Sequence, residues 1–426
     1  MRGTNHTAGS VRAMRDVPVT GRAPAPDLAR GAALLLIAVA NVHTFVTHRG
    51  IGVRTYPLDP TGVDAWLAAA QLTLVDGRAY PLFALLFGYG IAGLARRAAR
   101  AGAGPDQVLA LVRRRGGALF AVGAAHAVLL WHGDFVAAYG LIAVVLAPVL
   151  VRGSTAVLVL TGVAATTLLA VLYAPVALTR SDAASASPSL VAPDVVSAAV
   201  ERFGEWLFGN LLISAVGLAG AAVAGVLVAR AGWLDDPARH RRALRRVAVA
   251  GIGAGVVGGL PLGLVAAGAW TPSEPVALVV GVLHAVTGYA AGAGYAALAG
   301  LVVARRTRSA GAAPDGPGAV YRSPGDTGPV PGGWMSRALV ALGRRSLSGY
   351  LAQSVAFVAL FPAWTLGLGA GLPLWAATLC GAGVWLVTVV VAVVAERRGH
   401  RGPAEVLLRR LTYGRTPAPA HHPTGP

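Results

Sequence analysis

The residues best suited to do chemistry lie in the run HAVLLWHGDF at 126–135, where a long apolar stretch ends. A histidine beside a carboxylate is the usual composition of a general base and the group that orients it. We therefore predict catalytic roles for His126 and Asp134, with His132 as a weaker candidate. Two histidines and one aspartate at this spacing are a weak metal signal, so we predict no metal site. The alternative is a polar cluster at a membrane–water interface, beside Trp131, since tryptophan is enriched at such interfaces.

A second candidate, Asp76, interrupts another apolar run. A carboxylate inside a bilayer costs about 2.5–3.5 kcal/mol on insertion scales, so Asp76 should face a cavity or a partner. Gly77 and Pro81 predict a break in this span, which could bring Arg78 to the same side as Asp76. We predict a catalytic, orienting role for Asp76.

The first apolar run offers a third set of candidates on one helical face. Asn41, Thr44 and His48 recur at helical spacing, and Arg30 lies about three turns before Asn41. We predict His48 as catalytic and both Arg30 and Asn41 as substrate-binding. In the alternative, Arg30 anchors the helix at lipid headgroups and Asn41 makes an interhelical hydrogen bond. His43 points elsewhere on this helix and is the weaker candidate.

Two later runs complete the candidate site. His284 lies within an apolar run and is predicted either to bind substrate or to serve as a structural hydrogen-bond partner. Tyr350 and Gln353 belong to a polar line on one helical face, and we predict that they bind substrate. No G-x-S-x-G elbow, Walker loop or HExxH motif occurs. One GxGxxG match at 253–258 lies inside an apolar run without a preceding strand, which argues against a dinucleotide site.

These candidates must be positioned by membrane-spanning helices, because the chain consists mainly of apolar runs near the length of about 20 residues that a span requires. The predicted spans are 31–48, 64–94, 112–131, 135–151, 154–175, 206–229, 247–269, 275–304, 338–362 and 373–395. Gly251, Gly255 and Gly259, at four-residue spacing, predict close helix packing.

The joints between the spans alternate in charge. Arginines gather at the N-terminus, at 95–115, 230–246 and 305–345, and in the tail after Arg397. In the opposite joints arginine is sparse, and they hold Asp134, Asp182, Asp194, Glu201, Glu205 and Glu274. By the positive-inside rule both termini are cytoplasmic. The predicted fold is an all-α polytopic membrane bundle of about ten transmembrane helices, whose partner is the lipid bilayer.

Composition supports this class. The 426 residues are 55% hydrophobic and only 13% charged, with a mean hydropathy of +0.63, whereas soluble domains carry about 25% charged residues. The net charge of +18 comes entirely from arginine, since no lysine is present. These arginines lie beside apolar spans, which indicates cytoplasmic anchoring and argues against nucleic acid as a partner. Cys380 is the single cysteine, so an intrachain disulfide is excluded.

The predicted domain organisation depends on the same pattern. Residues 1–30 form a cytoplasmic segment without the apolar core of a signal peptide, and 31–304 hold the first eight spans. Residues 305–336, rich in Gly, Pro, Ala and Ser, are predicted to be a disordered cytoplasmic linker. The last two spans and a cytoplasmic tail occupy 337–415, and 416–426 are predicted to be disordered.

Three stretches together resemble one family of membrane proteins. They are VDGRAYPLFALLFGYGIAGLARRA, RRRGGALFAVGAAHAVLLWHGDFVAAYGLIAVVL, and GRRSLSGYLAQS leading to RGPAEVLLRRLTYGR. The chain is similar to the YeiB-like bacterial proteins that carry domain of unknown function 418. The resemblance covers most of residues 27–415 apart from 305–336, and it implies a multi-pass protein of the bacterial plasma membrane.

That family is distantly similar to transmembrane acyltransferases, among them acyltransferase-3 proteins and heparan-glucosaminide N-acetyltransferase. In acyltransferase-3 proteins an arginine on the first span is followed eleven positions later by a histidine, whereas here Arg30 is followed by Asn41. The heparan-type members also have asparagine there and a catalytic histidine shortly after, a role that His48 could fill. The resemblance implies transfer of an acyl group from a cytoplasmic donor to an acceptor across the membrane.

Two hypotheses for an activity remain open at this point, beside a third, non-catalytic role in envelope assembly. In the first, the protein is an acyltransferase in which His48 or His126 is the base, Asp76 or Asp134 orients it, and Arg30 with other arginines binds the phosphates of acyl-CoA. In the second, it is a small-solute transporter or exporter that uses the intramembrane Asp76, His126 and His284.

Overall fold

The computed structural model describes residues 23–311 and 333–414. Within these ranges the chain is α-helical apart from short 3-10 and π segments, loops and isolated β-bridges, which confirms the all-α prediction. Of the predicted N-terminal segment only residues 23–30 are described, and the predicted tail 416–426 lies outside the described residues. Helix α12 continues to Gly311, seven residues into the predicted linker, and residues 312–332 also lie outside the description.

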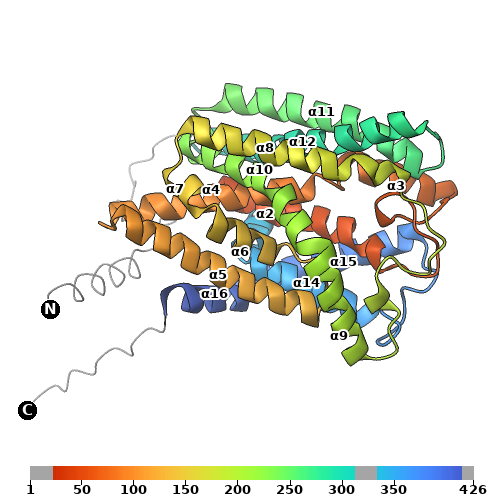
Figure 1. The fold of residues 1–426 in the computed structure, drawn as a ribbon. Coiled ribbons are helices and arrows are strands. Elements are labelled where there is room, and N and C mark those ends of the chain that lie inside the picture. Colours follow the sequence, from red (N-terminus) through yellow and green to blue (C-terminus); the bar gives the residue numbers. More distant parts are fainter. Residues whose placement is uncertain (1–22, 312–332, 415–426) are drawn as a thin grey trace, which may run out of the picture.

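The long helices lie side by side in one bundle (Figure 1). Their bounds are α2 Pro24–Val42, α3 Gly62–Leu74, α4 Ala79–Arg100, α5 Pro105–Leu129, α6 Val136–Val145, α7 Ala147–Arg152, α8 Thr155–Tyr173, α9 Val195–Gly204, α10 Leu211–Arg230, α11 Arg241–Ala266, α12 Glu274–Gly311, α13 Trp334–Arg344, α14 Ser346–Leu360, α15 Leu374–Arg397 and α16 Pro403–Tyr413.

Every predicted span overlaps a helix or a pair of helices, and seven helical segments of the described chain are long and apolar enough to cross a membrane. The other three predicted spans correspond to α5, to α6 with α7, and to α13 with α14. Helix α5 carries arginines in its third turn, and the other two are divided into shorter helices. Membrane crossing by these three remains a prediction.

Polar contacts among the loops and helices define two ends of the bundle. At one end Arg96 donates to Asp235 between α10 and α11, Arg230 donates to Gly153 between α7 and α8, and Arg114 contacts α16. We call this the basic end; α7 and α16 lie toward it, at the left of Figure 1. At the opposite end the loops after α2, α8 and α14 bond to one another, as where the amide of His48 donates to the Ala184 carbonyl. The arginine-rich joints 95–115 and 230–246 and the tail after Arg397 therefore lie at the same end.

The predicted break in the second span is confirmed. Helix α3 ends at Leu74 and α4 begins at Ala79, and between them Gly77 has a φ of 72°. That left-handed conformation favours glycine, and a Cβ on Gly77 would also lie 2.7 Å from Nε2 of His284. The break ends the regular hydrogen-bond ladder and leaves room for polar side chains beside it.

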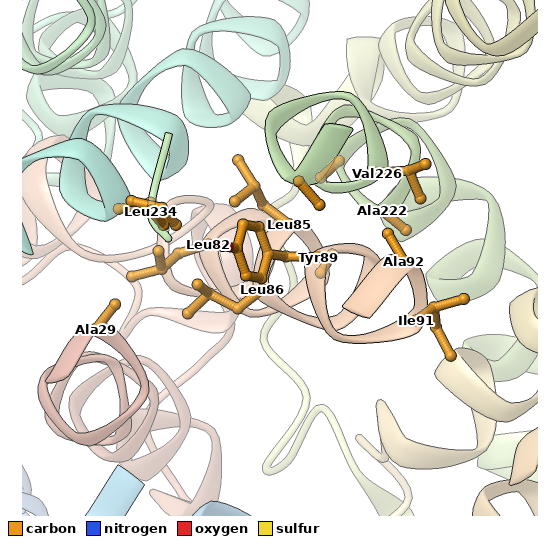
Figure 2. Close-up of a cluster of buried hydrophobic side chains, with 14 of the residues drawn as sticks. Ala29, Leu82, Leu85, Leu86, Tyr89, Ile91, Ala92, Ala222, Val226 and Leu234 are labelled. Atoms are coloured by element: carbon orange, nitrogen blue, oxygen red, sulfur yellow. The ribbon is translucent and has the colours of Figure 1, made fainter. Parts of the chain in front are cut away.

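Small residues allow the helices to pack closely. A Cβ on Gly251 of α11 would overlap the carbonyl oxygen of Ala290 of α12, which confirms the predicted glycine contact there. In the core, α4 packs against α10 in the same way, since Gly88 meets the backbone of Ala222. Figure 2 shows the apolar side chains around this contact, with Leu85 and Tyr89 of α4 near those of α10.

Candidate functional site

Three polar side chains make a buried hydrogen-bonded series near the opposite end of the bundle. His126 Nδ1 lies 2.9 Å from Oδ1 of Asp134, and His126 Nε2 lies 2.8 Å from Oγ of Ser354. The side chain of His126 is 1% exposed and that of Asp134 is fully buried. We call these three residues with Tyr350, whose ring centroid lies 5.0 Å from that of His126, the His126 cluster.

Separate helices hold the members of this cluster in place. His126 lies in the last turn of α5, and Asp134 precedes α6, where its Oδ2 accepts from the amide of Ala137 at 2.6 Å. Asn210 supports the same turn by donating to the carbonyl oxygens of His132 and Asp134. The Asp134 carboxylate can therefore orient the imidazole, as the sequence predicts.

For a neutral His126, these hydrogen bonds indicate one tautomer. A carboxylate only accepts, so Nδ1 of a neutral His126 donates to Asp134, and Nε2 is left as an acceptor. The Ser354 hydroxyl then donates to Nε2. A serine, a histidine and an aspartate in this order have the geometry of a nucleophile, its base and the orienting group.

A cavity of about 780 Å³ leads from the basic end to this cluster. Tyr350 lies in its wall, so a single ring separates the cavity from His126. The inner wall is mainly apolar and aromatic, and includes Phe83, Phe87, Phe135 and Tyr139.

The mouth of the cavity is strongly basic. Eight arginines line the cavity against three carboxylates, from Asp235, Glu396 and Glu405. The arginines are Arg30, Arg96, Arg97, Arg115, Arg344, Arg345, Arg401 and Arg409. An excess of guanidinium groups around an apolar interior suits an anionic ligand with an apolar tail.

Arg30 belongs to this cavity. Its side chain is 13% exposed, and it donates to Asp27 at 3.0 Å and to the carbonyl oxygen of Leu86 at 2.9 Å. It lies within α2, because that helix begins at Pro24, earlier than the predicted first span. The structure therefore places Arg30 and Tyr350 in the same cavity, with His126 and Asp134 directly behind Tyr350.

A second polar group, the Asp76 cluster, surrounds the break between α3 and α4. It consists of Asp76, Arg54, Arg78 and His284. Arg54 Nε donates to Oδ2 of Asp76 at 3.1 Å, and Arg54 Nη2 donates to Oδ1 at 2.6 Å. The Asp76 side chain is 2% exposed and that of Arg54 is 18% exposed.

Arg78 and His284 form the other half of this cluster. Arg78 is fully buried, and it donates to the carbonyl oxygens of Asp76 and Gly255 at 2.7 and 2.8 Å. Its Nη1 also lies 2.9 Å from Nδ1 of His284. His284 thus has a hydrogen-bond partner, as in the alternative prediction that this residue is structural.

Arg54 reaches Asp76 from a strained loop. Arg54 and Thr55 have φ values of 55° and 64°, in the left-handed region that non-glycine residues rarely occupy. Burial alone would lower the pKa of Arg54, but the Asp76 carboxylate outweighs burial and holds that pKa above its ordinary value. Arg54 therefore remains charged, and the bidentate pair compensates for the strained backbone.

Asn41 belongs to neither cluster and contacts the cavity wall indirectly, through Tyr80. Tyr80 Oη donates to Oδ1 of Asn41 at 2.5 Å, and the Tyr80 ring lies 4.2 Å from that of Phe135 in the cavity wall. Gln353 donates to the carbonyl oxygen of Leu34 at 3.3 Å, and its Oε1 accepts no hydrogen bond. Both amides are buried, and their substrate-binding role stays a prediction.

The predicted placement of His48 is wrong. Helix α2 ends at Val42, a 3-10 turn follows, and the backbone is extended at Val46, so the helical spacing from Asn41 does not continue. His48 is exposed in the loop with a φ of 62°. His43, the weaker candidate, is buried instead. Its Nε2 lies 3.1 Å from the Arg54 carbonyl oxygen, to which it can only donate, and 3.3 Å from the Thr55 hydroxyl.

Sequence reasoning missed Ser354 and Arg54. Ser354 lies four residues after Tyr350, so helical spacing already placed it on the face of the polar line. Arg54 carried no comparable signal, because it lies in an irregular loop. Within residues 23–311 and 333–414, no three His, Cys, Asp or Glu side chains are grouped to hold a metal ion.

A family model described as "Protein of unknown function (DUF418)" matches residues 228–314 and 329–415. Over these two stretches the chain is similar to that family. This confirms the predicted family resemblance over those residues, which include His284, Tyr350 and Ser354. The gap in the match, 315–328, is narrower than the segment 305–336 that we expected to lie outside the family. A search of curated proteins finds no match.

Proposed function

We propose that this protein is a membrane-bound acyltransferase that takes an acyl group from a cytoplasmic thioester donor and passes it to an acceptor on the other side. One observation carries the proposal. A cavity with an arginine-rich mouth and an aromatic interior ends at Tyr350, whose ring packs on the buried His126 of a His–Asp pair.

The donor is an acyl-CoA. Its phosphates suit the arginines of the mouth, where Arg96 and Arg401 belong to two different joints of the basic end. Its acyl chain suits the apolar wall beyond them. In this proposal the basic end faces the cytoplasm, in agreement with the positive-inside rule, and the bilayer is a bacterial plasma membrane.

His126 is the general base. Asp134 fixes its tautomer, so Nε2, which faces the Ser354 hydroxyl, can take a proton from a hydroxyl while burial excludes competing water. The acceptor is a hydroxyl or amine that approaches from the loops of the opposite end.

The alternative, a small-solute transporter, has less support. It requires Asp76, His126 and His284 to act together, but His126 bonds within one cluster, whereas the other two belong to the Asp76 cluster. Asp76 is moreover held bidentately by Arg54, which leaves it poorly suited to take up and release a proton.

The test uses the full chain in proteoliposomes with acetyl-CoA and palmitoyl-CoA outside. We expect release of free CoA that depends on an added acceptor panel, and a loss of about 10²–10⁴-fold in His126→Gln. His240→Gln, a histidine outside both clusters, is the matched control and should keep the rate.

No CoA release with either donor across the acceptor panel would contradict the proposal, and so would equal rates in His126→Gln and the control. Uptake of a solute driven by a pH gradient, lost in Asp76→Asn and without CoA chemistry, would favour the transporter instead.

A further inference from the structure

We propose that Ser354 is the nucleophile of this site and carries the acyl group as a covalent ester between two half-reactions. This inference rests on the proposed function and deepens it. A base that acts directly on the acceptor needs only His126 and Asp134. The position of Ser354 gives the base a hydroxyl of the protein itself to activate.

The hydrogen bonding of Ser354 differs from that of helical hydroxyls that bond to their own helix. Thr73 and Thr287 each donate to the carbonyl oxygen four residues earlier, at 2.7 Å. The corresponding distance from Ser354 Oγ to the Tyr350 carbonyl is 3.5 Å, whereas His126 Nε2 lies at 2.8 Å. The hydroxyl is therefore directed to the base and away from its own helix.

The location of Ser354 suits a carrier of the acyl group. It lies four residues beyond Tyr350 on α14, which is about 6 Å further from the basic end. A donor that fills the cavity would present its thioester at Tyr350. An acyl group attached to Ser354 would already lie on the far side of that ring, so donor and acceptor would not need to be bound at once.

The chemistry balances without a further reactant. Ser354 Oγ attacks the thioester carbonyl carbon, and His126 Nε2 takes the hydroxyl proton. The C–S bond then breaks, and the proton passes from His126 to the leaving thiolate, which departs as the free thiol. In the second half, the acceptor hydroxyl gives its proton to His126 and attacks the ester. The C–O bond to Ser354 breaks, and His126 returns the proton to Oγ.

The first measurement tests whether Ser354 is activated, independently of any donor. The intact protein is treated with a small alkyl fluorophosphonate, which phosphonylates activated serines with loss of fluoride, and the modified peptide is found by mass spectrometry. We expect modification at Ser354 that is lost in Ser354→Ala and in His126→Gln. Ser336→Ala, a similarly buried serine on α13, is the matched control. Tyr350→Ala removes the ring in front of Ser354 and should speed the modification.

The second measurement uses ¹⁴C-acetyl-CoA and ¹⁴C-palmitoyl-CoA without acceptor. We expect one hydroxylamine-sensitive label per chain at Ser354 and a matching burst of CoA. Ser354→Ala should lower acceptor-dependent transfer at least about a hundredfold. Ser354→Cys should restore the adduct as a thioester.

The outcomes separate this inference from the proposed function. Transfer that persists in Ser354→Ala, with no adduct in the wild type, overturns the inference and leaves direct transfer. Fluorophosphonate modification of Ser354 without any CoA release supports an activated serine and contradicts the proposed donor. Absence of both modification and adduct in the wild type and in Tyr350→Ala overturns the inference.

Discussion

The two buried polar clusters of this bundle differ in the partners of their carboxylates. In the Asp76 cluster the carboxylate is paired with arginine: Arg54 holds it bidentately, and the neighbouring Arg78 donates to two carbonyl oxygens. In the His126 cluster, no arginine contacts Asp134 in any hydrogen bond of the described residues. Its partners there are an imidazole and a backbone amide.

This difference indicates two roles. A carboxylate paired with arginine is stabilised in its charged form and resists proton transfer, so the Asp76 cluster ties the strained loop to the break between α3 and α4. A carboxylate whose partner is an imidazole orients a group that can gain and lose a proton. We infer that the first cluster maintains the fold and that the second, which adjoins the large cavity, does the chemistry.

The largest effect should come from Asp134→Asn. Asp134 uses separate oxygens to accept from His126 and from the Ala137 amide, but asparagine has only one oxygen. If that oxygen keeps the backbone amide, the new NH₂ faces His126 Nδ1 and forces the opposite tautomer, in which Nε2 cannot accept a proton. By analogy with serine hydrolases, kcat should fall by about 10⁴-fold.

The measurement is acceptor-dependent CoA release, with Asp182→Asn in an exposed loop as the matched control. Retention of more than about a tenth of the wild-type kcat in Asp134→Asn would mean that the carboxylate does not orient the base.

The next largest effect should be on the stability of the protein, and it concerns the Asp76 cluster. Asp76→Asn leaves the buried Arg54 without its counter-charge, so the free energy of unfolding should fall by about 3–5 kcal/mol. The double variant Arg54→Met/Asp76→Leu removes both charges and should recover most of that loss. Unfolding in mixed detergent micelles titrated with SDS measures both.

The control for this pair is Asp59→Asn, which breaks the exposed ion pair with Arg180 in the same loops. It should cost less than about 1 kcal/mol, because water screens that pair. A loss of similar size in Asp76→Asn and Asp59→Asn would show that the Asp76 cluster does not hold the loop.

Features that depend on periodicity and charge could be predicted from the sequence. The helices, the break at Gly77, the two ends of the bundle and the pairing of His126 with Asp134 all depend on local patterns. The error at His48 has a physical cause: Asn41 and His48 share a face only if the helix continues, and it ends at Val42. Arg54 could not be predicted, since an irregular loop sets its position and its partner lies 22 residues away.

Ser354 occupies an intermediate position. Its face on α14 could be derived from helical spacing, but its contact with His126 joins residues 228 apart, and no local pattern encodes such a distance. The division into two clusters was hidden for the same reason. From the sequence, Asp76 and His126 are both predicted to be buried titratable groups. Only the packing of α3, α5, α12 and α14 shows that their partners differ.

The smallest effect should come from Tyr350→Phe, and its contrast with Tyr350→Ala sharpens the comparison most. The Tyr350 hydroxyl lies 3.5 Å from the Gly133 carbonyl, a long contact, so removing it should change acceptor-dependent transfer by less than about threefold. The ring matters more, because it separates the cavity from His126. Tyr350→Ala should therefore admit water to the base and raise CoA release without acceptor, relative to transfer. If Tyr350→Phe and Tyr350→Ala give the same ratio of CoA release without acceptor to transfer, the Tyr350 ring does not separate the cavity from His126. The His126 cluster would then be as closed to the cavity as the Asp76 cluster.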